Sequence, residues 1–92
     1  MLPTLKMLST PTCPACVQMS RVLDEIKERY AGEINTEKIN VQEDRETARQ
    51  YNVMYVPTLL FVGRDGEILK QDVGCKPIEE VIETFKAAGV VL

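Results

Sequence analysis

The sequence contains no histidine and no tryptophan, and the missing histidine excludes several kinds of catalytic site. Cysteine–histidine pairs and Ser-His-Asp triads both need an imidazole to accept the proton of the nucleophile. A catalytic zinc site is also disfavoured, because three protein ligands of suitable type would be hard to assemble without imidazole. We therefore expect no metal site.

Long apolar runs and clusters of basic residues are also missing. No apolar stretch approaches the roughly 18–20 residues that a membrane span requires, and residues 1–6 lack the pattern of a signal peptide. The net charge of −3 is spread over interspersed side chains, whereas phosphate binding needs a clustered basic face. The longest charge-dense stretch, Glu43–Glu46, mixes both signs and predicts a solvated helix start. We expect a cytoplasmic protein without membrane or nucleic-acid partners, and we take it to be a monomer.

Cysteine is scarce and its number is odd, which argues against a structural disulfide framework in a cytoplasmic chain. Two of the three cysteines form the segment Cys13-Pro14-Ala15-Cys16, and Cys75 lies far from them. A chain of 92 residues is long enough for one hydrophobic core and too short for two, so residues 1–92 are expected to form a single domain.

The hydrophobic pattern predicts an α/β protein with the element order β-α-β-α-β-β-α. Apolar runs and alternation predict strands, three- and four-residue spacing predicts helices, and Asp65-Gly66 predicts a hairpin turn. The expected strands are Leu5–Leu8, Ile34–Val41, Thr58–Val62 and Glu67–Val73, and the expected helices are Pro14–Tyr30, Asp44–Tyr51 and one with Pro77 at its first position. The first two strands should be parallel, and the hairpin adds an antiparallel pair. The expected result is a four-stranded mixed sheet with helices on both faces.

The position of the cysteine pair, between the first strand and the first helix, favours redox chemistry. A sulfur at a helix N-terminus faces unpaired N–H groups and the positive end of the helix dipole. Both favour the thiolate form of Cys13, which is therefore the predicted nucleophile. Cys16 lies one turn inside the helix and is the predicted resolving thiol, which breaks a mixed disulfide.

The C-x-x-C spacing alone leaves other functions open, because it also occurs in zinc, iron–sulfur and copper sites. A metal carrier is the main alternative from another class, since copper carriers place the motif between a first strand and a first helix. Their element order is βαββαβ, however, whereas this chain ends in a helix after a hairpin. A redox-silent interaction domain is a third alternative, although such a domain would normally have lost one cysteine.

A proline at the start of the most apolar strand adds a second signal. Pro57 precedes Thr58–Val62, and inside a central strand a proline would interrupt the hydrogen-bond ladder. A C-P-x-C at the start of the first helix, a distant proline before a hydrophobic strand and a glycine after the next strand together resemble the thioredoxin superfamily. Residues 47–61 are similar to the corresponding thioredoxin stretch almost position by position, and the resemblance covers nearly the whole chain.

This resemblance implies a protein-disulfide oxidoreductase that needs no bound cofactor. Its substrates would be disulfide-containing proteins, and an NADPH-dependent flavoprotein similar to thioredoxin reductase would restore the dithiol. Pro57 would carry a cis peptide bond, and the backbone of Val56 would pair with an extended substrate. Pro14, Ala15 and Gly74 would complete the substrate-binding surface. An ordinary trans proline is the alternative for Pro57.

The sequence also departs from standard thioredoxin. It starts at the strand that leads to the cysteines, without the family's extra N-terminal strand and helix, and Thr12 replaces a tryptophan. Met7 stands where thioredoxins have a buried aspartate, although Lys38 matches the lysine beside it. Proton transfer at Cys16 is therefore expected to involve Lys38 and another carboxylate, for which Glu37 is the candidate, or water.

Two features of the sequence differ from glutaredoxins. Ala15 replaces the aromatic residue of glutaredoxins, and no Gly-Gly-x-x-Asp-like segment follows Val73, so dedicated glutathione binding is not expected. A glutathione-coupled reductase nevertheless remains the alternative within the superfamily.

The third cysteine, Cys75, lies next to Gly74 and is expected at the edge of the active-site surface. There it either forms regulatory disulfides or fills the turn before Pro77.

Overall fold

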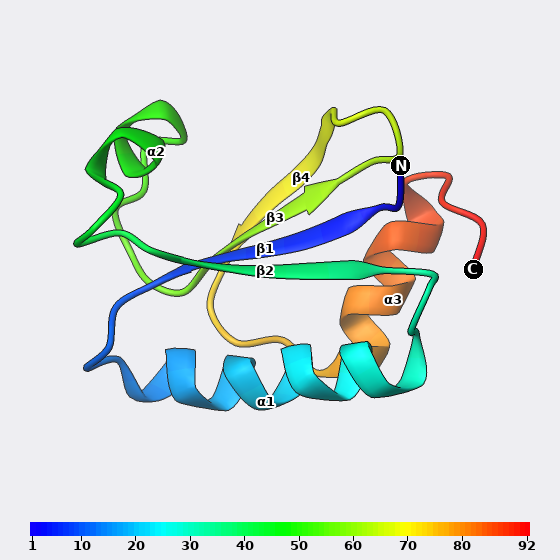
Figure 1. Ribbon diagram of the computed structural model, residues 1–92, viewed down its shortest axis with the longest axis horizontal. Coiled ribbons are helices and arrows are strands. Elements are labelled where there is room, and N and C mark those ends of the chain that lie inside the picture. The colour runs from blue at the N-terminus through cyan, green and yellow to red at the C-terminus, as the bar shows by residue number, and fades with distance from the viewer.

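A computed structural model describes all residues from 1 to 92 and contains one mixed sheet with three helices (Figure 1). The strands are β1 (Thr4–Ser9), β2 (Asn35–Asn40), β3 (Thr58–Val62) and β4 (Ile68–Val73), and the helices are α1 (Pro14–Arg29), α2 (Arg45–Gln50) and α3 (Ile78–Ala87). The predicted order β-α-β-α-β-β-α is confirmed.

The sheet has the strand order β2-β1-β3-β4. β1 pairs with β2 in parallel through the α1 crossover, while β1–β3 and β3–β4 are antiparallel, as predicted. β3 lies between two neighbours and is buried along its whole length, which explains its uninterrupted apolar sequence. The mixed four-stranded sheet is thus confirmed.

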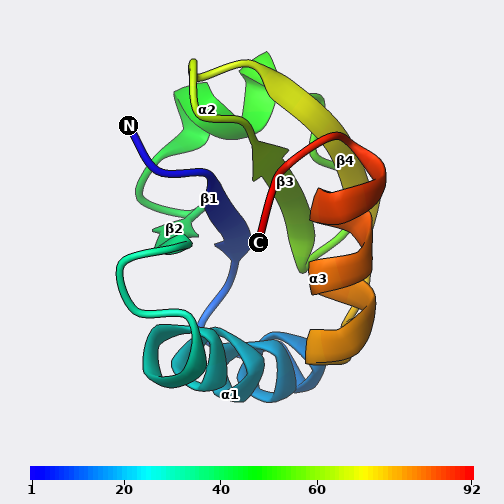
Figure 2. The same cartoon turned by 90° about the vertical axis from the view of Figure 1, so that its right-hand side faces the viewer.

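Helices cover both faces of this sheet, as expected. Figures 1 and 2 place α1 and α3 against one face, and α2 over the opposite face near the end where β1 leads into α1. The larger core lies between the sheet and the α1/α3 pair, and its twelve buried residues are Leu5, Met7, Met19, Leu23, Ile26, Ile34, Leu59, Phe61, Ile78, Val81, Ile82 and Phe85. The rings of Phe61 and Phe85 meet edge to face with centroids 5.2 Å apart, which joins β3 to α3.

Every element except β3 differs from the prediction by one residue at one or both ends, and the starts of α3 and β4 show why. Pro77 is the residue before α3 rather than its first residue, because its ψ of 158° is extended; its carbonyl accepts the Val81 N–H at 3.1 Å. β4 begins at Ile68 because Glu67 belongs to the hairpin turn, in which the Gly63 N–H donates to the Glu67 carbonyl at 2.8 Å. Gly66 has a φ of +86°, a conformation that suits glycine.

Asp44 is the N-cap residue of α2, one residue before the helix begins at Arg45. The Asp44 carboxylate accepts the Thr47 hydroxyl at 2.7 Å and the Thr47 N–H at 3.1 Å. These hydrogen bonds hold the pKa of Asp44 below its usual value, and the bond from the Thr47 hydroxyl has the larger effect. None of the three helices, of which α1 is the longest with 16 residues, has both the length and the apolar character needed to span a bilayer.

Candidate active site

The cysteine pair lies at the start of α1, on the end of the molecule that α2 overhangs (Figure 1). Cys13 is the N-cap residue, with extended backbone angles, and its sulfur accepts the Cys16 N–H at 3.1 Å. The cysteine sulfur thus takes the place that a serine or aspartate oxygen occupies at other helix starts. Pro14 occupies the first helical turn, where its missing N–H leaves no bond unmade. The local sequence therefore directs one N–H donor at the Cys13 sulfur.

One distant loop contacts Cys13, and a second loop contacts the first. The Val56–Pro57 peptide bond is cis, as the family resemblance implied. The Val56 carbonyl accepts the Cys13 thiol at a sulfur–oxygen distance of 3.7 Å, and the Pro57 carbonyl accepts the Gly74 N–H at 2.8 Å. Gly74 has a φ of +98°, which a side chain would disfavour. The structure thus brings together Cys13, Val56, Pro57 and Gly74 from three separate segments.

The two cysteines differ in their environments. Cys16 is 4% exposed, whereas Cys13 is only partly buried, and both thiols are free. Burial, followed by a hydrogen bond with Cys13, raises the pKa of Cys16 from 9.0 to about 11. Cys16 is therefore a neutral thiol at physiological pH and must lose a proton before it can attack.

This raised pKa gives a testable pH dependence. In a Cys13→Ala/Cys75→Ser variant, alkylation of folded Cys16 by iodoacetamide is expected to be slow at pH 8. It should increase with a midpoint above 9.0 and up to about 11, because the burial remains while the contribution of Cys13 is lost. Since the folded pKa is raised, the stabilising effect of the neutral thiol is complete below pH 9.0 and disappears as the pH rises through 11. Mass spectrometry gives the rates, the urea-unfolded variant is the control, and a midpoint at or below that of the unfolded chain would contradict the expectation.

A polar cavity of about 390 Å³ lies behind Cys16. Met7 and Lys38, which are partners in the β1–β2 register, both line it, and so does Glu43. Glu37 does not, because adjacent strand residues point to opposite faces of a sheet. Its carboxylate instead lies 3.8 Å from the Lys6 ammonium group.

The structure therefore places Lys38 at the same cavity as Cys16 and directs Glu37 elsewhere. Glu43, which the sequence placed only in a solvated helix start, is the carboxylate that shares the cavity with Cys16. Its N–H donates to the Asn40 carbonyl at 3.1 Å, in the turn that follows β2. Only the mixed-sign run at Glu43–Glu46 marked this position in the sequence, and that run carries no signal of a cavity.

The remaining predicted residues surround this centre. Pro14 is exposed and Ala15 is half-buried beside Cys13. Cys75 is exposed and directly follows Gly74; the next residue, Lys76, contacts α1 through its N–H, which lies 3.4 Å from the Met19 sulfur. No group of three His, Cys, Asp or Glu side chains is placed to hold a metal ion.

A thiol pair at a helix start, facing a cis-proline loop on a four-stranded mixed sheet, defines the class of thiol–disulfide oxidoreductases with a thioredoxin fold. Comparisons with known proteins agree. The family described as Thioredoxin matches residues 3–87. A thioredoxin of Bacillus subtilis is 40% identical over 73 residues, which cover 79% of this chain and 69% of that protein. A probable thioredoxin of Methanothermobacter thermautotrophicus is 34% identical over 85 residues, 92% of this chain and 94% of its own.

A solved structure of a malarial protein has a TM-score of 0.88 with this chain at 19% identity. The match covers 98% of this chain and 100% of that one, and it supports the fold alone. The family match and the sequence relatives also show the family and the class of activity. The chain belongs to the thioredoxin family and is a thioredoxin-like protein-disulfide oxidoreductase.

Proposed function

We propose that this protein reduces disulfide bonds in other proteins through Cys13 and Cys16 and is recycled by an NADPH-dependent flavoprotein of the thioredoxin-reductase type. We also propose that residues 1–92 act as one monomeric domain in the cytoplasm. The observation that carries the proposal is the position of Cys13. Its sulfur accepts the Cys16 N–H at 3.1 Å and lies 3.7 Å from the Val56 carbonyl, at an exposed edge of the molecule.

The reaction has two exchange steps. The Cys13 thiolate attacks one sulfur of the substrate disulfide, forming a mixed disulfide and releasing the other sulfur as a thiolate, which takes up a proton. Cys16 then loses its proton and attacks the Cys13 sulfur, which forms the Cys13–Cys16 disulfide and releases the second substrate thiolate. The flavoprotein returns two electrons, and two protons are taken up, to restore both thiols.

Proton transfer at Cys16 is assigned to the cavity behind it. Lys38 and Glu43 are the two ionisable groups that line this cavity besides Cys16 itself. An ionised carboxylate can accept a proton, and an ammonium group can donate one. Glu43 thus replaces Glu37 as our candidate for the carboxylate that thioredoxins place at the position of Met7.

Backbone pairing supports a polypeptide substrate. Val56 lies outside the strands, and its N–H makes no hydrogen bond within the chain. A free main-chain donor next to Cys13 suits strand addition by an extended segment around the substrate disulfide. Pro14, Ala15 and Gly74 flank the same edge and complete the proposed binding surface.

A coupled assay tests this function. Wild-type protein with NADPH and thioredoxin reductase is expected to reduce insulin disulfides catalytically, measured as NADPH oxidation. A Cys13→Ala/Cys16→Ala variant should show only the background rate. Turnover with glutathione and glutathione reductase but not with thioredoxin reductase would favour the glutathione-coupled alternative. Tight stoichiometric Cu(I) binding without any disulfide reduction would favour a metal carrier, whose βαββαβ order differs from the observed one.

A further inference from the structure

A second groove, of about 430 Å³, opens next to the cysteine pair on the side of α2. Its apolar wall includes Val41, Val53, Met54 and Val56, and its other wall carries Arg45 and Arg49 from α2. We call it the arginine groove. It adjoins the active site because the carbonyl of Val56 accepts the Cys13 thiol at 3.7 Å.

The arginine groove also connects to the cavity behind Cys16. Thr10, the residue after β1, lines both spaces. In Figure 1 α2 lies above the same end of the sheet at which β1 passes into α1. A chain that pairs with the Val56 backbone can therefore continue over the groove without leaving the protein surface.

The two charged side chains that line the groove are both positive. Arg45 and Arg49 are four residues apart and so project from the same side of α2, where like charges oppose each other. Neither takes part in any of the four ion pairs of the protein, and no carboxylate lines the groove. The neighbouring Asp44 carboxylate is occupied by two hydrogen bonds from Thr47. Two free guanidinium groups at this spacing suit a ligand with carboxylates, which arginine binds through paired hydrogen bonds.

The groove also offers apolar surface. Met54 is 74% exposed at its rim, and a flexible thioether side chain adapts to varied apolar partners. A carboxylate compound without apolar groups would use only one of the two walls.

We propose that the arginine groove binds an acidic and apolar segment of the substrate protein, adjacent to the disulfide that Cys13 attacks. The groove thereby selects substrates in which aspartate or glutamate lies near the reactive cysteine. This inference rests on the proposed function, since it describes the substrate class of the same site. The partner is a polypeptide rather than free glutathione, because glutathione has no apolar side chain to fill the wall of valine and methionine side chains.

Two matched disulfide peptides test the proposal. One carries two glutamates beside one of its cysteines, and the other carries glutamines in their place. The wild type is expected to reduce the acidic peptide with a kcat/KM roughly tenfold higher, as two partly exposed ion pairs would give. An Arg45→Gln/Arg49→Gln variant should lose this preference and keep its rate on the glutamine peptide. Added salt should shrink the preference in the wild type, because exposed charges are screened.

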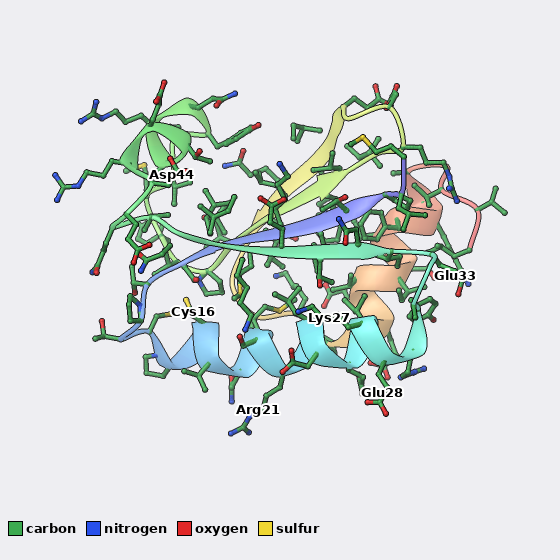
Figure 3. All side chains as sticks on the ribbon, viewed as in Figure 1. Cys16, Arg21, Lys27, Glu28, Glu33 and Asp44 are labelled. Carbon is green, nitrogen blue, oxygen red and sulfur yellow. The ribbon has the colours of Figure 1, made fainter.

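An Arg21→Gln/Arg64→Gln variant is the matched control, since it loses the same charge away from the groove. Arg21 is on α1 and points away from α2 (Figure 3), and Arg64 lies in the turn between β3 and β4. This control should keep the full preference. The thermal midpoint of the Arg45→Gln/Arg49→Gln variant should equal or exceed that of the wild type, because a like-charge pair is removed.

The outcomes separate this proposal from the proposed function. Equal wild-type rates on the two peptides, or an equal loss of preference in the control variant, would overturn the arginine groove and leave disulfide reduction intact. A loss confined to the reduction of oxidised glutathione would also overturn it, in favour of a small carboxylate ligand. No reduction of either peptide by the wild type would overturn the proposed function itself.

Discussion

Replacing Cys13 by serine is expected to lower the rate of insulin reduction by at least about 10³-fold, because a serine hydroxyl is not ionised near neutral pH and makes a poor nucleophile. The hydroxyl can still accept the Cys16 N–H, so the helix start and the fold should persist. The rate is measured by NADPH oxidation in the coupled assay. Cys75→Ser is the control and should retain activity, since Cys75 takes no part in the proposed exchange.

The Cys16→Ser variant should fail at a different step. Its Cys13 still attacks the substrate, but no second thiol of the protein breaks the mixed disulfide. A covalent complex with the substrate should therefore accumulate, and dithiothreitol should cleave it by reducing the disulfide. Mass spectrometry under non-reducing conditions detects the complex. Full turnover by the Cys13→Ser variant, or a trapped complex in Cys13→Ser instead of Cys16→Ser, would contradict the assigned roles.

Truncating the aromatic pair in the main core is expected to have the largest effect on stability. Phe61 and Phe85 are 1% and 0% exposed, and their rings are 5.2 Å apart. Phe85→Ala should lower the free energy of unfolding by about 3–5 kcal/mol, since it removes apolar burial and leaves a cavity between β3 and α3. Domains of this kind have roughly 5–15 kcal/mol of stability, so the loss is a large fraction of the total.

Urea unfolding followed by circular dichroism measures this loss. Phe85→Leu is the matched control, because it keeps most of the apolar volume and should cost less than half as much as the alanine variant. At low temperature the folded Phe85→Ala protein should still reduce insulin. Phe85 packs on Phe61, which pairs with Leu5 near the start of β1, whereas the cysteines follow the other end of that strand. A loss below about 1 kcal/mol would mean that the core closes around the missing ring.

The sequence did not determine which charged side chains reach the cavity of Cys16. Lys38 and Glu37 are adjacent in the sequence, and both looked available to Cys16. Residue alternation in β2 places them on opposite faces, so Lys38 reaches the cavity while Glu37 meets Lys6. Glu43 reaches the same cavity only because the chain turns back after β2. The face toward which each side chain points depends on the pairing of β2 with β1, which the composition of the strand does not specify.

The role of the charged segment before and within α2 likewise depends on the tertiary structure. Its mixed signs predicted a solvated helix start, and Arg45 and Glu46 are indeed exposed. Arg45 and Arg49 line one groove together with Val56, which is near them in space although it is distant in the sequence. A helical spacing predicts that two side chains share a face, but not which surface lies opposite that face.

The C-x-x-C motif could be located, and its redox role favoured, from the sequence alone. The helix start at Pro14, the apolar run of β3 and the proline before it are local signals, because propensity, turn chemistry and periodicity act over a few neighbouring residues. These signals determined the element order, the mixed sheet and the family resemblance. The family resemblance also implied that Val56, Gly74 and Lys38 belong to the site. The tertiary structure alone decided that Glu43 shares the cavity of Cys16, that Glu37 faces Lys6 and that α2 lies beside Val56, since strand register and loop packing act across long stretches of chain.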